Sequence, residues 1–230
     1  MSWHGFCYLH RMDRTITLIN SMFSRQVIGI TSAGKNINEL KSEIIRKILH
    51  FLIAMVPGMA AINKTATITI LMIGTLGYAL MEYLRLSGVR VPVISSLTSM
   101  ASRPRDFGCF VMGPVTLGLG ALLALLLYPS NAAAIAIYAL AFGDGFASLA
   151  GKFLGRWRPV FLRGKSIEGS LACFIMVLLS AYAVCGSASI ALAAAFTAMV
   201  VEALPLEDYD NLVIPVTVGM TVQLASGIIS

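Results

Sequence analysis

The residues best suited to chemistry lie in three short polar segments of an otherwise apolar chain. The first segment is Phe142–Arg156, which contains a single acidic residue, Asp144, between Gly143 and Gly145. We interpret the two glycines as clearing space around the Asp144 carboxylate, as metal binding requires. The alternative is structural, because Asp144 would also pair with Lys152 along one helix or accept a hydrogen bond in helix packing.

At helical spacing this first segment forms two adjacent stripes. A stripe of small residues, which plain helix packing explains, comprises Gly143, Ala147, Gly151 and Gly155. A polar stripe beside it comprises Asp144, Ser148, Lys152 and Arg156. Gly143 and Lys152, one on each stripe, are candidate nucleotide-binding residues.

The second segment runs from Arg163 to Ser170 and offers groups that bind phosphate. A P-loop is excluded, because that motif needs a glycine five positions before Gly164, where this chain has Pro159. Helix capping alone would explain the serine and the glutamate, whereas a lysine is disfavoured at a helix N-terminus. The candidate nucleotide-binding residues of this segment are Arg163, Gly164, Lys165, Ser166, Glu168 and Gly169.

The third segment, Glu202–Asn211, is acidic. Its carboxylates repel one another unless cations neutralise them; they belong to Glu202, Glu207, Asp208 and Asp210. A solvated acidic loop suffices for Glu207 but not for Glu202, which ends an apolar stretch. Magnesium is usually held by one or two carboxylates together with substrate phosphates, so we predict metal ligands among Asp144, Glu202 and Asp210.

The composition of the chain predicts that membrane-spanning helices position these three segments. Of the 230 residues, 57% are hydrophobic and 12% charged, and residues 108–143 and 169–201 contain no charged residue or histidine. A membrane helix needs roughly 20 apolar residues, so an all-α, polytopic bundle is expected. About seven spans are predicted, at 47–62, 66–84, 108–128, 131–151, 169–186, 188–204 and 211–229. Pro57-Gly58 predicts a kink or re-entrant turn in the first span. Residues 1–43 are expected to form a loosely ordered or amphipathic cytoplasmic extension, which precedes a membrane domain at 44–230.

The distribution of basic residues predicts the orientation of these spans. All of the 17 positive charges except Lys64 fall before the first span or in alternate loops, on one predicted side of the membrane. The positive-inside rule makes that side cytoplasmic and puts the N-terminus inside. We therefore attribute the net charge of +6 to topology, with no nucleic-acid partner, and expect the polar segments to face the cytoplasm (the inner membrane, in a bacterium).

Taken together, the three segments resemble the CTP-dependent lipid kinases, the group that includes dolichol, phytol and yeast-type diacylglycerol kinases. The likeness is carried in order by Gly143-Asp144, by Lys165-Ser-Ile-Glu-Gly-Ser170, and by Glu202-Ala-Leu-Pro205 with Asp210-Asn211 and Pro215. Upstream, Arg46-Lys47-x-x-His50 and Glu82-x-x-Arg85 also match family positions, and the likeness spans about residues 44 to 229.

The resemblance implies a magnesium-dependent transferase that moves a phosphoryl group from CTP to the hydroxyl of a membrane lipid. It implies Asp144, Lys165 and Glu202 as catalytic residues, and a nucleotide pocket shaped in part by Asn211. Cytidylyl transfer to phosphatidate, the reaction of the related phosphatidate cytidylyltransferases, is the enzymatic alternative. A non-enzymatic transporter or lipid-binding membrane protein is the second.

Overall fold

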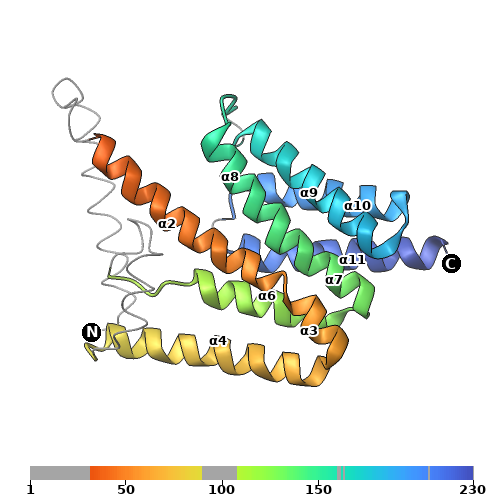
Figure 1. The fold of residues 1–230 in the computed structure, drawn as a ribbon, viewed down its shortest axis with the longest axis horizontal. Helices are drawn as coiled ribbons and strands as arrows, with labels where there is room; N and C mark the ends of the chain where they lie inside the picture. The colour runs from red at the N-terminus through yellow and green to blue at the C-terminus, as the bar shows by residue number, and fades with distance from the viewer. Residues whose placement is uncertain (1–31, 90–107, 160–161, 163, 207, 230) are drawn as a thin grey trace. The chain divides into compact units, whose positions relative to one another are not determined.

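The structure is a computed structural model that describes residues 32–89, 108–159, 162, 164–206 and 208–229, with the backbone alone for 32–42 and 228–229. These residues form helices and no strands, which confirms the predicted all-α class for this part of the chain (Figure 1). In chain order the helices are α2 (Ser32–Ile53), α3 (Val56–Ile62), α4 (Lys64–Leu86), α6 (Gly113–Leu127), α7 (Ser130–Tyr138), the π-helix η2 (Ala139–Asp144), α8 (Gly145–Phe153), α9 (Ile167–Cys185), α10 (Ala188–Ala203) and α11 (Asp210–Ile229).

Several of these helices have the length and composition of membrane spans. Four stretches of the described chain are long and apolar enough to cross a membrane: Glu43–Ile62, Lys64–Leu86, Ser130–Phe153 and Ile167–Cys185. Two shorter apolar helices are Gly113–Leu127 and Ala188–Ala203. A helix lies at the position of every predicted span, although the helix ends differ from the predicted ones.

The largest difference in helix ends is in the first span. Here α2 begins at Ser32, before the predicted start, and the helix is interrupted at Ala54 and Met55 before α3 begins. Pro57 has no N–H to donate to the carbonyl of Ile53, and its ring would clash with a continuing helix. The amides of Ala54 and Met55 bond instead to carbonyls three residues back, which confirms the predicted break.

The chain divides into two compact units, formed by Met1–Arg46 with Leu80–Val111 and by Lys47–Ala79 with Met112–Ser230. The predicted boundary at residues 43/44 falls inside α2, and the division into an extension and a membrane domain stays a prediction.

In the first unit, a buried ion pair joins the end of α4 to the segment before α6. Glu82 is fully buried and accepts hydrogen bonds from Arg85 Nε at 2.8 Å and Nη2 at 2.7 Å. Its Oε1 also accepts the amide of Val111 at 3.0 Å, while Arg85 donates to the carbonyl of Cys109 at 3.2 Å. The end of α4 is thereby fixed to the segment that leads into α6.

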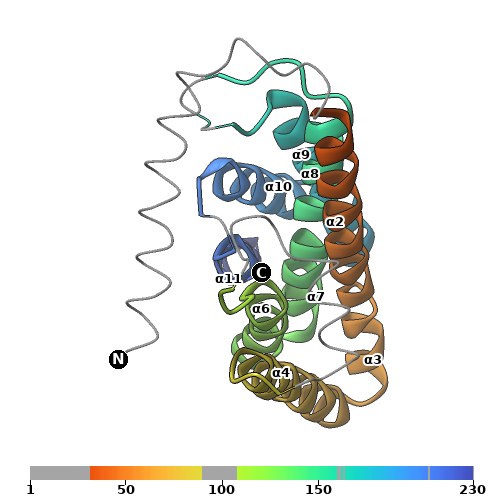
Figure 2. The same ribbon diagram turned by 90° about the vertical axis from the view of Figure 1, so that its left-hand side faces the viewer.

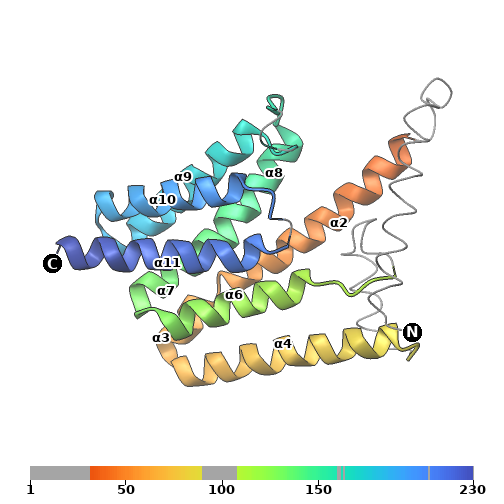
Figure 3. The same ribbon diagram turned by 180° about the vertical axis from the view of Figure 1, so that it is seen from behind.

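In the second unit, α11 lies between α10 and α6 and also contacts α7, while α9 packs against α8 and α10 (Figures 2 and 3). Fully buried apolar side chains from several of these helices, including Ile135, Val177, Ala194 and Ile214, form its core. The stripe of small residues on α8 faces α9, as predicted. An added Cβ at Gly143 would lie 2.8 Å from Val177 Cγ2, and Ala147 is 3% exposed. Because α8 ends at Phe153, the last members of both predicted stripes lie in the loop that follows.

Candidate functional site

Asp144 is the last residue of η2, a π-helical turn inside an otherwise continuous helical stretch from Ser130 to Phe153. A π-turn inserts an extra residue into the helix and is found mostly at functional sites. The Asp144 carboxyl group is only 5% exposed. A buried carboxylate is costly unless it is paired, so its partners determine what this position can do.

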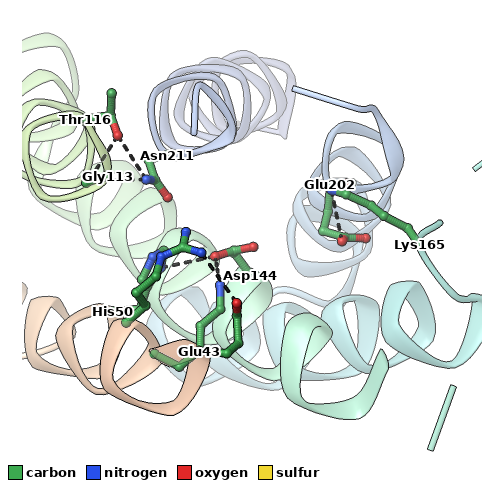
Figure 4. Close-up of polar contacts among 10 residues, drawn as sticks. Glu43, His50, Gly113, Thr116, Asp144, Lys165, Glu202 and Asn211 are labelled. Atoms are coloured by element: carbon green, nitrogen blue, oxygen red, sulfur yellow. Dashed lines mark hydrogen bonds and ion pairs between the residues drawn. The ribbon is translucent and has the colours of Figure 1, made fainter. Parts of the chain in front are cut away.

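The partners of Asp144 come from α2. Lys47 Nζ donates to Asp144 Oδ2 at 2.5 Å, and His50 Nδ1 lies 3.2 Å from the same oxygen (Figure 4). Lys47 and His50 are 2% and 4% exposed, so the whole group is withdrawn from water. Both contacts fall on Oδ2, and among the described residues Oδ1 has no hydrogen-bond partner. The alternative pairing of Asp144 with Lys152 along one helix does not form.

The docking of α2 explains how these side chains reach Asp144. Lys47, His50 and Phe51 stand at i, i+3 and i+4, so they share one face of the helix. The Phe51 ring lies 5.1 Å from the ring of Phe146, and an added Cβ at Gly145 would be 2.9 Å from its Cε1. The space beside the carboxylate that the sequence predicted at Gly145 is therefore filled by Phe51.

A second ion pair joins the loop before α9 to the end of α10. Lys165 Nζ lies 3.2 Å from Glu202 Oε1 and also donates to the Glu202 carbonyl oxygen. Ser170 Oγ donates to Glu202 Oε2 at 3.2 Å. The Glu202 side chain is 7% exposed and the Lys165 side chain 27%, so the ammonium group reaches the edge of the buried cluster. Such an ammonium group is placed to meet a phosphate that arrives from outside.

Ser166, Gly169 and Glu168 have partners within the protein. Ser166 is the N-cap of α9, where its Oγ accepts the amide of Gly169 at 3.1 Å. An added Cβ at Gly169 would lie 2.7 Å from the carbonyl oxygen of Ala147, so this glycine lets α9 approach α8 closely. The Glu168 carboxylate accepts the amides of Arg156 and Trp157 at 3.0 and 3.1 Å. The capping interpretation is confirmed for Ser166, whereas Glu168 binds amides of the preceding loop.

Asn211 ties the first turn of α11 to α6. Its Nδ2 donates to Thr116 Oγ1 at 3.0 Å and to the carbonyl of Gly113 at 3.4 Å. Pro215, four residues on, has no N–H, so the Asn211 carbonyl lacks its usual helical donor. A Cβ added at Gly120 would lie 2.0 Å from this carbonyl oxygen, so Gly120 lets α6 approach the start of α11 closely. The Asn211 amide group is thus occupied by α6 and fixes the start of α11 against it.

Asp210, the first residue of α11, lies within electrostatic range of Asp144, Lys47 and Lys165. Asp144 and Lys165 also interact electrostatically with each other. The ion pairs of Asp144 and of Glu202 therefore belong to one charged cluster, built from α2, η2, the loop before α9, α10 and α11. We call Lys47, His50, Asp144, Lys165, Glu202 and Asp210 the charged cluster.

In the part of the chain that the structure describes, the charged cluster does not form a metal site from protein groups alone. Within the described residues, no group of three or more His, Cys, Asp or Glu side chains lies close enough to hold a metal ion. Asp144, Glu202 and Asp210, predicted as ligands, do not form such a group by themselves. Magnesium needs only one or two carboxylates when phosphates complete its shell.

The other predicted residues lie at the margin of the charged cluster or outside it. Lys152 is exposed in the last turn of α8, and Gly143 is packed against α9. Gly164 has φ of +98° and accepts a hydrogen bond from Arg158 at its carbonyl, 2.7 Å away. Arg163 lies outside the described residues, as does Glu207.

Lys47 and His50 were not predicted as site residues, although the resemblance already included them. The spacing Lys47-x-x-His50 puts two polar side chains on one helix face within a candidate span, where buried polar groups are usually functional. That signal identifies a polar face. It does not identify Asp144, 97 residues away, as the partner.

Comparison with known proteins gives a distant relative. The chain is 26% identical over 184 residues to an uncharacterized protein of Methanocaldococcus jannaschii, covering 79% of this chain and 93% of the relative. No protein-family model matches this chain, and no solved structure does.

Proposed function

We propose that this protein is a polytopic membrane enzyme that transfers the γ-phosphoryl group of CTP to the hydroxyl of a membrane lipid. One observation carries the proposal. The three sequence segments that resemble CTP-dependent lipid kinases contribute Asp144, Lys165, and Glu202 with Asp210 to one charged cluster. Coincidental similarity in three short motifs gives no reason for their side chains to lie within electrostatic range of one another.

The proposal includes a topology of seven spans with the N-terminus in the cytoplasm. The apolar helices support it, and so does the placement of all positive charges but Lys64 on one predicted side. In this topology the charged cluster lies near the cytoplasmic surface, where a soluble nucleotide and a lipid hydroxyl can both reach it.

Each polar group then has a role in phosphoryl transfer, a reaction that depends mainly on positioning and charge neutralisation. Lys165, with Lys152 or Arg163, holds the triphosphate. Bound magnesium, held by one or two carboxylates among Asp144, Glu202 and Asp210, would neutralise phosphate charge.

In the transfer step the lipid oxygen forms a bond to the γ-phosphorus, the bond from that phosphorus to CDP breaks, and CDP departs. A carboxylate of the charged cluster accepts the hydroxyl proton. We assign this role to Asp144, because Lys47 and His50 fix its Oδ2 and leave Oδ1 to face the substrate.

The test is incubation of the purified full chain, in lipid nanodiscs, with γ-labelled CTP, magnesium and extracted membrane lipids. We expect a labelled lipid and CDP. Release of pyrophosphate with formation of a CDP-lipid would instead establish cytidylyl transfer, the second candidate. No turnover, together with unchanged thermal stability in Mg-CTP, would favour the non-enzymatic alternative.

The decisive variant is Asp144→Asn, which keeps the shape of the side chain and removes its charge. Loss of a general base typically lowers the rate by about 10²–10⁴-fold, so we expect activity near background. The matched control is Lys64→Met, which removes an exposed charge at the start of α4. Near-normal transfer by the Asp144→Asn variant would remove Asp144 from the mechanism.

A further inference from the structure

The loop between α8 and α9 exposes a large apolar surface at the end of a candidate membrane span. Trp157 is 71% exposed, and Phe153 and Leu154, at the end of α8 and just beyond it, are 61% and 67% exposed. Contiguous apolar surface of this kind marks a contact with another molecule or with a membrane. No residue of the charged cluster except Lys165 comes from this loop, so its exposed side chains need a separate explanation.

Trp157 is held on the outside of the loop by hydrogen bonds on both sides. Its amide donates to Glu168 Oε1 at 3.1 Å, and its carbonyl accepts the amide of Ile167 at 3.1 Å. Arg158 spans the loop, because its guanidinium donates to the carbonyls of Gly151 at 2.6 Å and Gly164 at 2.7 Å. The exposure of the indole ring is therefore a property of a defined loop conformation.

The chemistry of the loop indicates what covers it. Residues 152–166 contain five basic residues and no acidic one. The basic and apolar side chains alternate: Lys152 and Arg156 are exposed beside Phe153 and Trp157. Tryptophan is enriched where membrane helices meet the headgroup layer, and basic residues beside a span are attracted to anionic lipids.

The position of the loop agrees with this chemistry. Phe153 ends the candidate span Ser130–Phe153, and Trp157 follows only four residues later. An indole ring at this distance from the end of a span belongs in the headgroup layer, where its apolar body and its polar N–H are both accommodated.

We propose that the first part of the α8–α9 loop, residues 154–158, is a docking surface for anionic phospholipid headgroups, with Trp157 buried in the headgroup layer and Arg156 paired with lipid phosphate. The proposal rests on the membrane placement proposed above but on neither CTP nor phosphoryl transfer. It extends the function by giving the charged cluster a fixed depth relative to the lipid surface.

Intrinsic fluorescence tests this directly, because the chain has two tryptophans and Trp3→Phe leaves Trp157 as the single emitter. The Trp3→Phe protein is placed in nanodiscs containing phosphatidylcholine and phosphatidylglycerol, with one lipid brominated at a time. We expect brominated phosphatidylglycerol to quench Trp157 more strongly than brominated phosphatidylcholine, and shallow bromines more strongly than deep ones. Aqueous acrylamide should quench weakly.

Arg156→Gln is the informative variant, since only the backbone amide of Arg156 is used to build the loop. One basic residue near an anionic surface contributes a factor of about five, so this variant should reduce the preference for phosphatidylglycerol about fivefold. Lys64→Gln, a change of the same type at an exposed position outside the loop, should leave it unchanged.

Equal quenching by the two lipids, or an unchanged preference in Arg156→Gln, would overturn the anionic-lipid assignment. Strong acrylamide quenching with none from brominated lipid would overturn the docking surface altogether. Protection of Trp157 by Mg-CTP without lipid quenching would also overturn it, assigning the ring to the nucleotide. Extraction by alkaline carbonate would show that membrane placement itself is wrong, which separates that failure from the failure of this proposal.

Discussion

Replacing Lys47 by methionine tests how the protein holds a charged carboxylate in its interior. The variant keeps most of the side-chain volume and removes the ammonium that lies 2.5 Å from Asp144 Oδ2. The side chains of the pair are 3% and 7% exposed, so water replaces the lost partner poorly. Removing one member of a buried ion pair costs about 3–5 kcal/mol, because the other charge is left uncompensated. We expect the free energy of unfolding of Lys47→Met to fall by that amount.

The double variant Lys47→Met/Asp144→Asn gives the comparison that isolates the pair. It removes both charges and leaves no buried ion without a partner, so it should recover most of the stability lost in Lys47→Met. Replacing a buried pair by neutral groups is often close to neutral in stability. The assay is unfolding of the purified variants in mixed detergent micelles, followed by helical circular dichroism. Lys64→Met, at an exposed site, should change stability by less than about 0.5 kcal/mol.

The same variants separate stability from chemistry. The double variant should be folded and unable to transfer phosphate from CTP. A loss below about 1 kcal/mol in Lys47→Met, or simple additivity in the double variant, would refute the argument that the pair is buried and coupled. A stable double variant with normal transferase activity would show that Asp144 and Lys47 have only a structural role.

Three further changes test the supporting structure. Ser166→Ala should lower the free energy of unfolding by about 1 kcal/mol, because the N-cap of α9 is lost. A loss of transfer rate beyond about 100-fold would show instead that Ser166 also binds the nucleotide. Gly120→Ala should lower the free energy of unfolding by about 3 kcal/mol, since its Cβ would lie 2.0 Å from a backbone oxygen. Gly118→Ala should lower it by only about 1 kcal/mol, because its Cβ would lie 2.2 Å from a threonine hydroxyl that can rotate away. Equal changes in melting temperature for the two variants would contradict this reasoning. Asn211→Leu should lower the free energy of unfolding by about 1–3 kcal/mol. Adding Thr116→Val should lower it little further, because both changes remove the same hydrogen bond. Fully additive losses in the double variant would contradict this.

Within the described residues, the sequence by itself determined the helical class, the presence of a helix at each predicted span, and the stripe of small residues that packs on α9. These features follow from local rules. Long apolar runs can satisfy their backbone only as helices, Pro57 interrupts the first of them, and glycine or alanine at every fourth residue permits close helix contact. The capping of α9 by Ser166 followed from the same local chemistry.

Only the tertiary structure decided which charges meet. Lys47 and Asp144 are 97 residues apart, and no local rule pairs them; the docking of Phe51 against Gly145 brings them together. From the sequence we interpreted the glycines beside Asp144 as leaving open space, but side chains of neighbouring helices fill that space. A glycine permits close approach by a protein side chain as readily as by a ligand. The amide of Asn211 was likewise expected at a nucleotide and is bonded to α6. Long-range pairing depends on how helices pack, and the residues that determine packing are apolar and carry no motif.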